Sequence, residues 1–71
     1  MFSTISRIMM TIQDMEENQQ FIIIDENWDE FIIDVSVFNV GAYWEINEKS
    51  ASPEDVLKLW ENSKEFEIRT I

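Results

Sequence analysis

Two runs of strand-forming residues, joined by a short charged segment, constrain the fold most. Residues 21–24 (FIII) and 30–38 (EFIIDVSVF) are rich in β-branched and aromatic side chains, which favour strands. In the second run Asp34 and Ser36 alternate with apolar residues, as expected for one polar and one buried face. A turn alone needs only Asn-Gly or Asp-Gly. The joining segment DENWDE (residues 25–30) carries four carboxylates and a tryptophan, so its composition exceeds what turning requires.

The N-terminal part has two interpretations. Residues 4–18 place Ile5, Ile8 and Ile12 on one face of a helix that Ser3 or Thr4 can cap. The alternative is a strand, because Ile8, Met10 and Ile12 also alternate. The longer helical pattern favours the helix.

The C-terminal half predicts a strand, a helix and a strand. Residues 42–48 point Trp44 one way and Tyr43 and Glu45 the other. In SASPED, Ser52 is suited to cap a helix that opens with Pro53. The buried stripe of that helix is Val56, Leu59 and Trp60, and residues 65–71 alternate as a final strand with Phe66 and Ile68 inward.

These elements define a small α+β fold in the order α-β-β-β-α-β. A chain of 71 residues forms at most one domain, spanning residues 1–71. We expect a single layer of three to four mainly antiparallel strands with two helices on one face. The predicted core of the sheet is Ile23, Ile33, Val35, Val37 and Trp44.

The opposite face of the sheet carries more apolar side chains than a water-facing sheet should. These are Ile22, Ile24, Ile32, Phe38 and Tyr43. Two explanations are open: the N-terminal Met1 and Phe2 fold across this face, or a partner or second copy covers it. We therefore also expect a homodimer, or a large apolar contact, through this face.

The residue types exclude most catalytic chemistry. The chain has no Cys and no His, which removes thiolate nucleophiles and the usual base near neutral pH. Gly41 is the single glycine, so no glycine-rich phosphate loop exists. DENWDE begins like a calcium loop but has Glu30 where that loop needs Gly and Ser36 where it needs Glu. We expect no enzyme activity, no metal and no cofactor.

The charge is large and segregated, and it indicates the kind of partner. The net charge is −10, and ten acids but no base lie between Arg7 and Lys49. Such a surface attracts a basic protein and repels nucleic acid and membranes. We also expect a cytoplasmic location, in a host cell, because no long apolar run or signal peptide is present. The predicted partner-binding residues are Asp14, Glu17, Asp25, Glu26, Trp28, Asp29, Glu30, Asp34, Glu45 and Glu48.

Trp28 itself has two interpretations. It can be an anchor for a partner, because tryptophan is enriched at binding hot spots with a polar surround. It can also be a lid that folds back over the strand ends.

Acids at alternate strand positions lie about 6.6 Å apart on one face, a spacing of the same order as that between neighbouring phosphates. With its acidic strands and DENWDE tip, the chain resembles small acidic proteins of phages and mobile elements that mimic nucleic acid, such as anti-CRISPR and anti-restriction proteins and uracil-DNA glycosylase inhibitors. The resemblance covers the whole chain as layout, without a diagnostic motif. It implies a stoichiometric inhibitor that occupies the nucleic-acid-binding site of a nuclease or other nucleic-acid enzyme. One such anti-CRISPR family ends in a further helix, whereas a final strand is predicted here.

The alternative is an antitoxin or immunity-type protein that neutralises a basic toxin.

Overall fold

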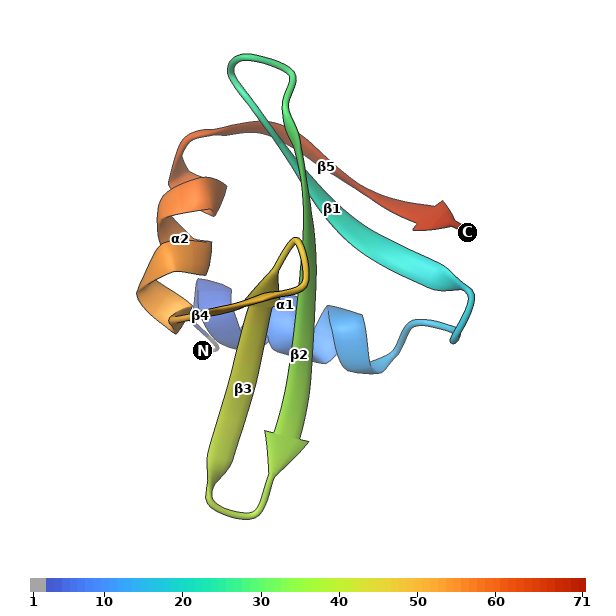
Figure 1. Ribbon diagram of the computed structural model, residues 1–71, viewed down its shortest axis with the longest axis vertical. Coiled ribbons are helices and arrows are strands. Elements are labelled where there is room, and N and C mark those ends of the chain that lie inside the picture. Colours follow the sequence, from blue (N-terminus) through green and yellow to red (C-terminus); the bar gives the residue numbers. More distant parts are fainter. Residues whose placement is uncertain (1–2) are drawn as a thin grey trace.

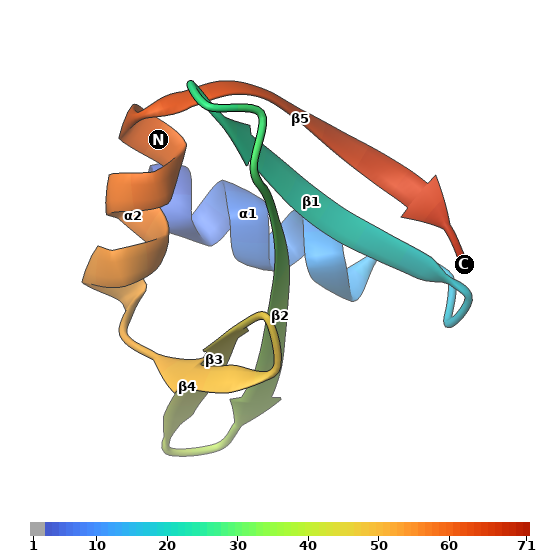
Figure 2. The ribbon, with the colours of Figure 1, turned by 45° about the horizontal axis from the view of Figure 1, so that its top comes forward.

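The computed structural model describes residues 3–71 as two helices on one face of a five-stranded antiparallel sheet (Figures 1 and 2). The strand order is β4-β3-β2-β1-β5. The elements are α1 (Thr4–Gln13), β1 (Gln19–Asp25), β2 (Glu30–Phe38), β3 (Gly41–Ile46), β4 (Lys49–Ala51), α2 (Pro53–Glu61) and β5 (Ser63–Thr70). The α+β class and the element order are confirmed.

The first segment is a helix, and it is shorter than the predicted span of residues 4–18. Ser3 caps α1, because its side chain accepts the N–H of Ser6. The helix ends at Gln13. Extending it would place Glu16 and Glu17 in the last turn, where the helix dipole disfavours negative charge. The chain turns there instead, and the side chain of Gln19 accepts the N–H of Glu16 at 2.9 Å.

The sheet has one strand more than expected. The third predicted strand, residues 42–48, ends at Ile46, and Asn47 and Glu48 form a two-residue turn into β4. Both turn residues have positive φ, 51° and 68°, as the hairpin turn that matches strand twist requires. β4 was not predicted because its sequence, KSA, lacks the β-branched and aromatic residues that indicate a strand.

The core lies between the helices and the middle of the sheet. Trp44 and Ile23 are 2% and 0% exposed there, and Ile8 of α1 and Val56 of α2 pack against them. Ser52 and Asp55 form a reciprocal capping box that starts α2 where predicted. Ile23, Ile33, Val35 and Trp44 are buried, Leu59 and Trp60 are half-buried, and Val37, Phe66 and Ile68 are exposed. The predicted face is right for these last three, but they are not buried, because Val37 lies near the free end of the β2–β3 hairpin and the other two lie on the edge strand β5.

The sheet face opposite the helices, called the open face below, is not uniformly exposed. Ile22 and Ile24 are only 1% and 5% exposed, so the expectation that they are spare apolar surface was wrong. Arg69 of β5 reaches Glu30 of β2 through two hydrogen bonds of 2.8 and 2.9 Å. β1 lies between those strands. Its pairing register places Ile22 below the line that joins Arg69 to Glu30 across the open face.

The apolar surface that remains on the open face is smaller than predicted. Ile32 is half-buried, while Phe38 and Tyr43 are exposed on the β2–β3 hairpin. Met1 and Phe2, which were considered as a cover for this face, lie outside the described residues.

Candidate partner-binding surface

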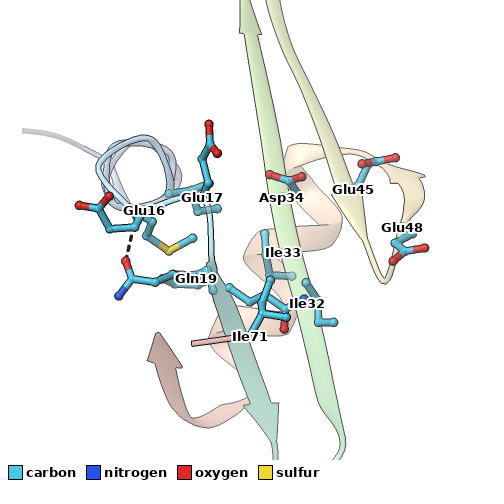
Figure 3. Close-up of a pocket in the computed structure, with 13 residues that line it drawn as sticks. Glu16, Glu17, Gln19, Ile32, Ile33, Asp34, Glu45, Glu48 and Ile71 are labelled. Atoms are coloured by element: carbon cyan, nitrogen blue, oxygen red, sulfur yellow. Dashed lines mark hydrogen bonds between the residues drawn. The ribbon is translucent and has the colours of Figure 1, made fainter. Parts of the chain in front are cut away.

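A groove lined by five acids forms where the end of α1 meets β2 and the β3–β4 hairpin (Figure 3). It has a volume of about 350 Å³, and none of the described residues that line it is basic. We call it the acidic groove and define it by Glu16, Glu17, Asp34, Glu45 and Glu48. Three separate parts of the chain supply these carboxylates, so the groove exists only in the folded protein.

Two of these acids stand directly opposite each other in the sheet. Asp34 on β2 pairs in register with Glu45 on β3, and both side chains lie on the open face. Like charges at such a position destabilise a sheet. No Lys or Arg among residues 3–71 forms an ion pair with either acid. The chain therefore keeps a repulsive pair where one neutral residue would be more stable.

Glu48 adds a second local cost in the same groove. Its φ of 68° belongs to the left-handed region, which favours glycine in this type of turn. Its neighbour Asn47 suits the turn well, because Asn tolerates positive φ, and its side chain also accepts the N–H of Ile32 at 2.9 Å.

The other acidic site is the acidic tip, the turn between β1 and β2, defined by Asp25, Glu26, Trp28, Asp29 and Glu30. Asp25 organises it: its Oδ1 accepts the N–H groups of Asn27 and Asp29 at 2.9 and 3.0 Å. The backbone N–H of Asp25 also donates to the carbonyl of Asp29 at 3.1 Å. The carboxylate of Asp25 thus has a structural role in addition to the predicted role in binding.

Trp28 occupies the position of this turn that normally belongs to glycine. A three-residue hairpin loop ends in a left-handed residue, and Trp28 has φ 66° there. Its side chain is 61% exposed, so it is not a lid over the strand ends. Lys64 Nζ lies 4.4 Å from the ring centroid, a cation–π contact that holds the indole at the surface.

The role of Asp25 leads to a stability prediction. Asp25→Ala removes the acceptor for two backbone N–H groups, and we expect it to cost about 1 kcal/mol and lower the melting temperature by about 4–8 °C. Asp25→Asn keeps a carbonyl acceptor and should melt close to the parent. Glu26→Ala is the matched control, because Glu26 is exposed in the same turn. Equal melting temperatures for Asp25→Ala and Glu26→Ala, measured by circular dichroism, would contradict this role.

Glu30 differs from the other acids of the tip because it is paired. Hydrogen bonds from Arg69 hold the pKa of Glu30 below its ordinary value. Arg69 also donates from Nε to Glu67 at 2.6 Å. Arg69 therefore neutralises part of the charge at this end of the open face, whereas Asp34 and Glu45 have no such partner within the described part of the chain.

The structure brings the predicted residues together in two groups. Five form the acidic tip, while Glu17, Asp34, Glu45 and Glu48 line the acidic groove. Asp14 joins neither, because it is the exposed C-cap of α1 and its N–H donates to Met10.

Sequence reasoning missed Glu16 of the groove, and Glu65 and Glu67 of β5, whose register places them beside Ile24 and Ile22 on the open face. The predicted alternation with Phe66 and Ile68 already pointed Glu67 outward, but neither β5 acid was counted among the partner-binding residues.

Other kinds of site find no support in residues 3–71. No group of three or more His, Cys, Asp or Glu side chains in this range is arranged to hold a metal ion. Neither described helix is long and apolar enough to cross a membrane. Comparisons with models of protein families, with curated proteins and with solved structures find no match to this chain.

Proposed function

We propose that this protein is a stoichiometric inhibitor whose acidic surface occupies the nucleic-acid-binding site of a nuclease or other nucleic-acid enzyme in the cytoplasm of a host cell. The observation that carries the proposal is the opposed pair Asp34 and Glu45 on an open sheet face, with which no cationic side chain of residues 3–71 forms an ion pair. A domain of this size has little stability to spare. Because the repulsive charge is retained at such a position, we infer that it serves to bind a partner and not to stabilise the fold.

The arrangement of the acids suits a site that evolved for phosphates. On the open face Asp34 of β2 lies opposite Glu45 of β3, and Glu65 and Glu67 of β5 are two residues apart, with Glu67 paired to Arg69. Alternate residues of a strand are separated by about 6.6 Å. A groove lined by Lys and Arg would meet a row of negative charges, and binding would release counterions as nucleic acid does.

A second candidate function is supported by Trp28. An exposed indole in a left-handed backbone conformation is strained, and such strain gathers at binding sites. An antitoxin or immunity-type protein would use this ring as an anchor in a pocket of a basic toxin, with the acids as a surrounding polar ring.

Displacement by nucleic acid separates the two functions. The chain is immobilised and tested against a panel of purified nucleases, nucleic-acid-modifying enzymes and basic toxins. We expect a retained enzyme to be displaced by generic duplex DNA or by RNA, because they compete for one site. Polyglutamate at the same charge concentration is the control and should displace it less. If nucleic acid does not displace the retained protein, mimicry is contradicted. An inhibitor that binds outside the partner's nucleic-acid-binding site is then favoured.

A further inference from the structure

β5 is a long edge strand, and the backbone groups on its outer side are not paired with another strand of residues 3–71. It spans eight residues and pairs with β1 on one side, and no other strand of residues 3–71 lies along its other side. The opposite edge, β4, has only three residues. Natural edges are usually blocked by proline, bulges, short length or charged side chains, and of these β5 carries charges of both signs at Lys64, Glu65, Glu67 and Arg69. Ser63–Thr70 contains no proline, and the single irregularity in its pairing lies at the Ser63 end.

The hydrogen-bond pattern shows which groups of β5 point outward. The N–H of Ile71 donates to the carbonyl of Asn18 at 2.7 Å, in the same register as the pair Gln19 and Thr70. In an antiparallel ladder, hydrogen-bonded and non-hydrogen-bonded pairs alternate. Arg69, Glu67 and Glu65 therefore direct their backbone groups at β1. The residues between them, Phe66, Ile68 and Thr70, direct theirs away from the sheet.

The side chains of this edge are apolar on one face. Phe66 and Ile68 lie on the helix-packed face yet are 49% and 44% exposed. Phe66 stacks on Phe21 at 5.5 Å between ring centroids and contacts Trp60 at 5.1 Å. The apolar core thus reaches the outer edge of the sheet, where Phe66 and Ile68 are about half exposed among the described residues.

We propose that β5 pairs antiparallel with β5 of a second copy about a two-fold axis at Glu67, which gives a continuous ten-stranded sheet. In this register Phe66 lies opposite Ile68 of the second copy, and these residues carry the outward backbone groups. On the open face Glu65 lies opposite Arg69 of the second copy, an opposite-charge pair made twice. The register thus joins the exposed apolar residues and pairs opposite charges.

The neighbouring symmetric registers are worse. A shift of two residues in one direction places Glu65 opposite Glu67 of the second copy, which brings like charges together. A shift in the other direction places Phe66 opposite Thr70 of the second copy, so the pairing of Phe66 with Ile68 is lost.

Net charge opposes this association, and that gives it a distinct salt dependence. Each copy carries −10, and Glu67 meets its own counterpart at the axis, although Arg69 binds each Glu67. Added salt screens this repulsion. The dimer should therefore strengthen with NaCl, whereas a complex of the acidic surface with a basic enzyme should weaken. Failure of the dimer would leave the proposed inhibitor function untouched.

Cysteine cross-linking tests the register directly, because the parent chain has no Cys. At Glu67 the two copies would form a non-hydrogen-bonded pair with Cα atoms about 4.5 Å apart, within the range of a disulfide. We expect Glu67→Cys to form a covalent dimer under mild oxidation about tenfold faster than Glu48→Cys, an exposed control on the β3–β4 turn. Equal rates for the two variants would overturn the proposal.

Sedimentation of the parent chain gives a measurement that does not depend on the cysteine variant folding. From micromolar to millimolar concentration in moderate NaCl, the parent should shift from monomer to dimer. Ile68→Lys should remain a monomer with a far-UV spectrum like that of the parent. A parent that stays monomeric throughout, or an Ile68→Lys variant that dimerises equally well, would also overturn the proposal.

Discussion

Trp28→Gly is expected to fold about as stably as the parent and to release its partner about thirtyfold faster, the effect of losing a hot spot worth about 2 kcal/mol. The backbone of Trp28 is left-handed, which costs a non-glycine residue roughly 1–2 kcal/mol and glycine nothing. Against this gain stand the lost contact with Lys64, about 0.5–1 kcal/mol, and the greater freedom of glycine in the unfolded chain. The gain and the losses in the free energy of unfolding nearly cancel.

Trp28→Ala is the matched control, because it removes the indole and keeps the backbone strain. We expect it to melt below Trp28→Gly and to release the partner at the same increased rate. The measurements are thermal melts and dissociation in a surface-binding assay. If both variants melt well below the parent and dissociate at the parental rate, the ring stabilises the fold and is not an anchor.

Asp34→Asn combined with Glu45→Gln is expected to raise the melting temperature by roughly 2–6 °C at low salt, because it removes a like-charge pair opposed across two strands. Asn at position 34 keeps the oxygen that accepts the N–H of Val35 at 2.8 Å. Since one neutral member is enough to end the repulsion, each single variant should give most of the gain. The gain should shrink as NaCl is added. Additive single effects, or a lower melting temperature, would show that the two charges do not oppose each other.

The order of elements could be predicted from local patterns, because each pattern corresponds to one local cause. SASPED contains a cap, a proline and first-turn acids, and α2 starts at Pro53 as expected. The end of α1 was harder to predict. Met15 continues the apolar period, but α1 ends at Gln13, and the helix dipole disfavours an extension that would place Glu16 and Glu17 in its last turn.

The acidic groove could not be predicted as one site from the sequence. Glu17, Asp34 and Glu48 are far apart along the chain, and their approach depends on the α1–β1 turn and on the β4 strand, which was not foreseen. The burial of Ile22 likewise depends on Arg69, which must cross from one side of β1 to the other. Alternation along a strand predicts which face of the sheet a side chain lies on. It does not predict that an arginine two strands away extends across that side chain.

The proposed function requires that the open face, and not net charge alone, binds the partner. Asp34→Asn/Glu45→Gln and Glu54→Gln/Glu61→Gln each raise the net charge of −10 by two units. The second pair lies on α2, which packs on the opposite face, and its acids sit near the two ends of that helix, so their dipole effects oppose each other.

The measurement is the association rate of each variant with an enzyme that the immobilised parent retains, at one low salt concentration. We predict that the open-face variant associates about tenfold more slowly than the parent, while the α2 variant stays close to the parental rate. Equal slowing of the two variants would show that only total charge matters and would contradict the proposed binding surface.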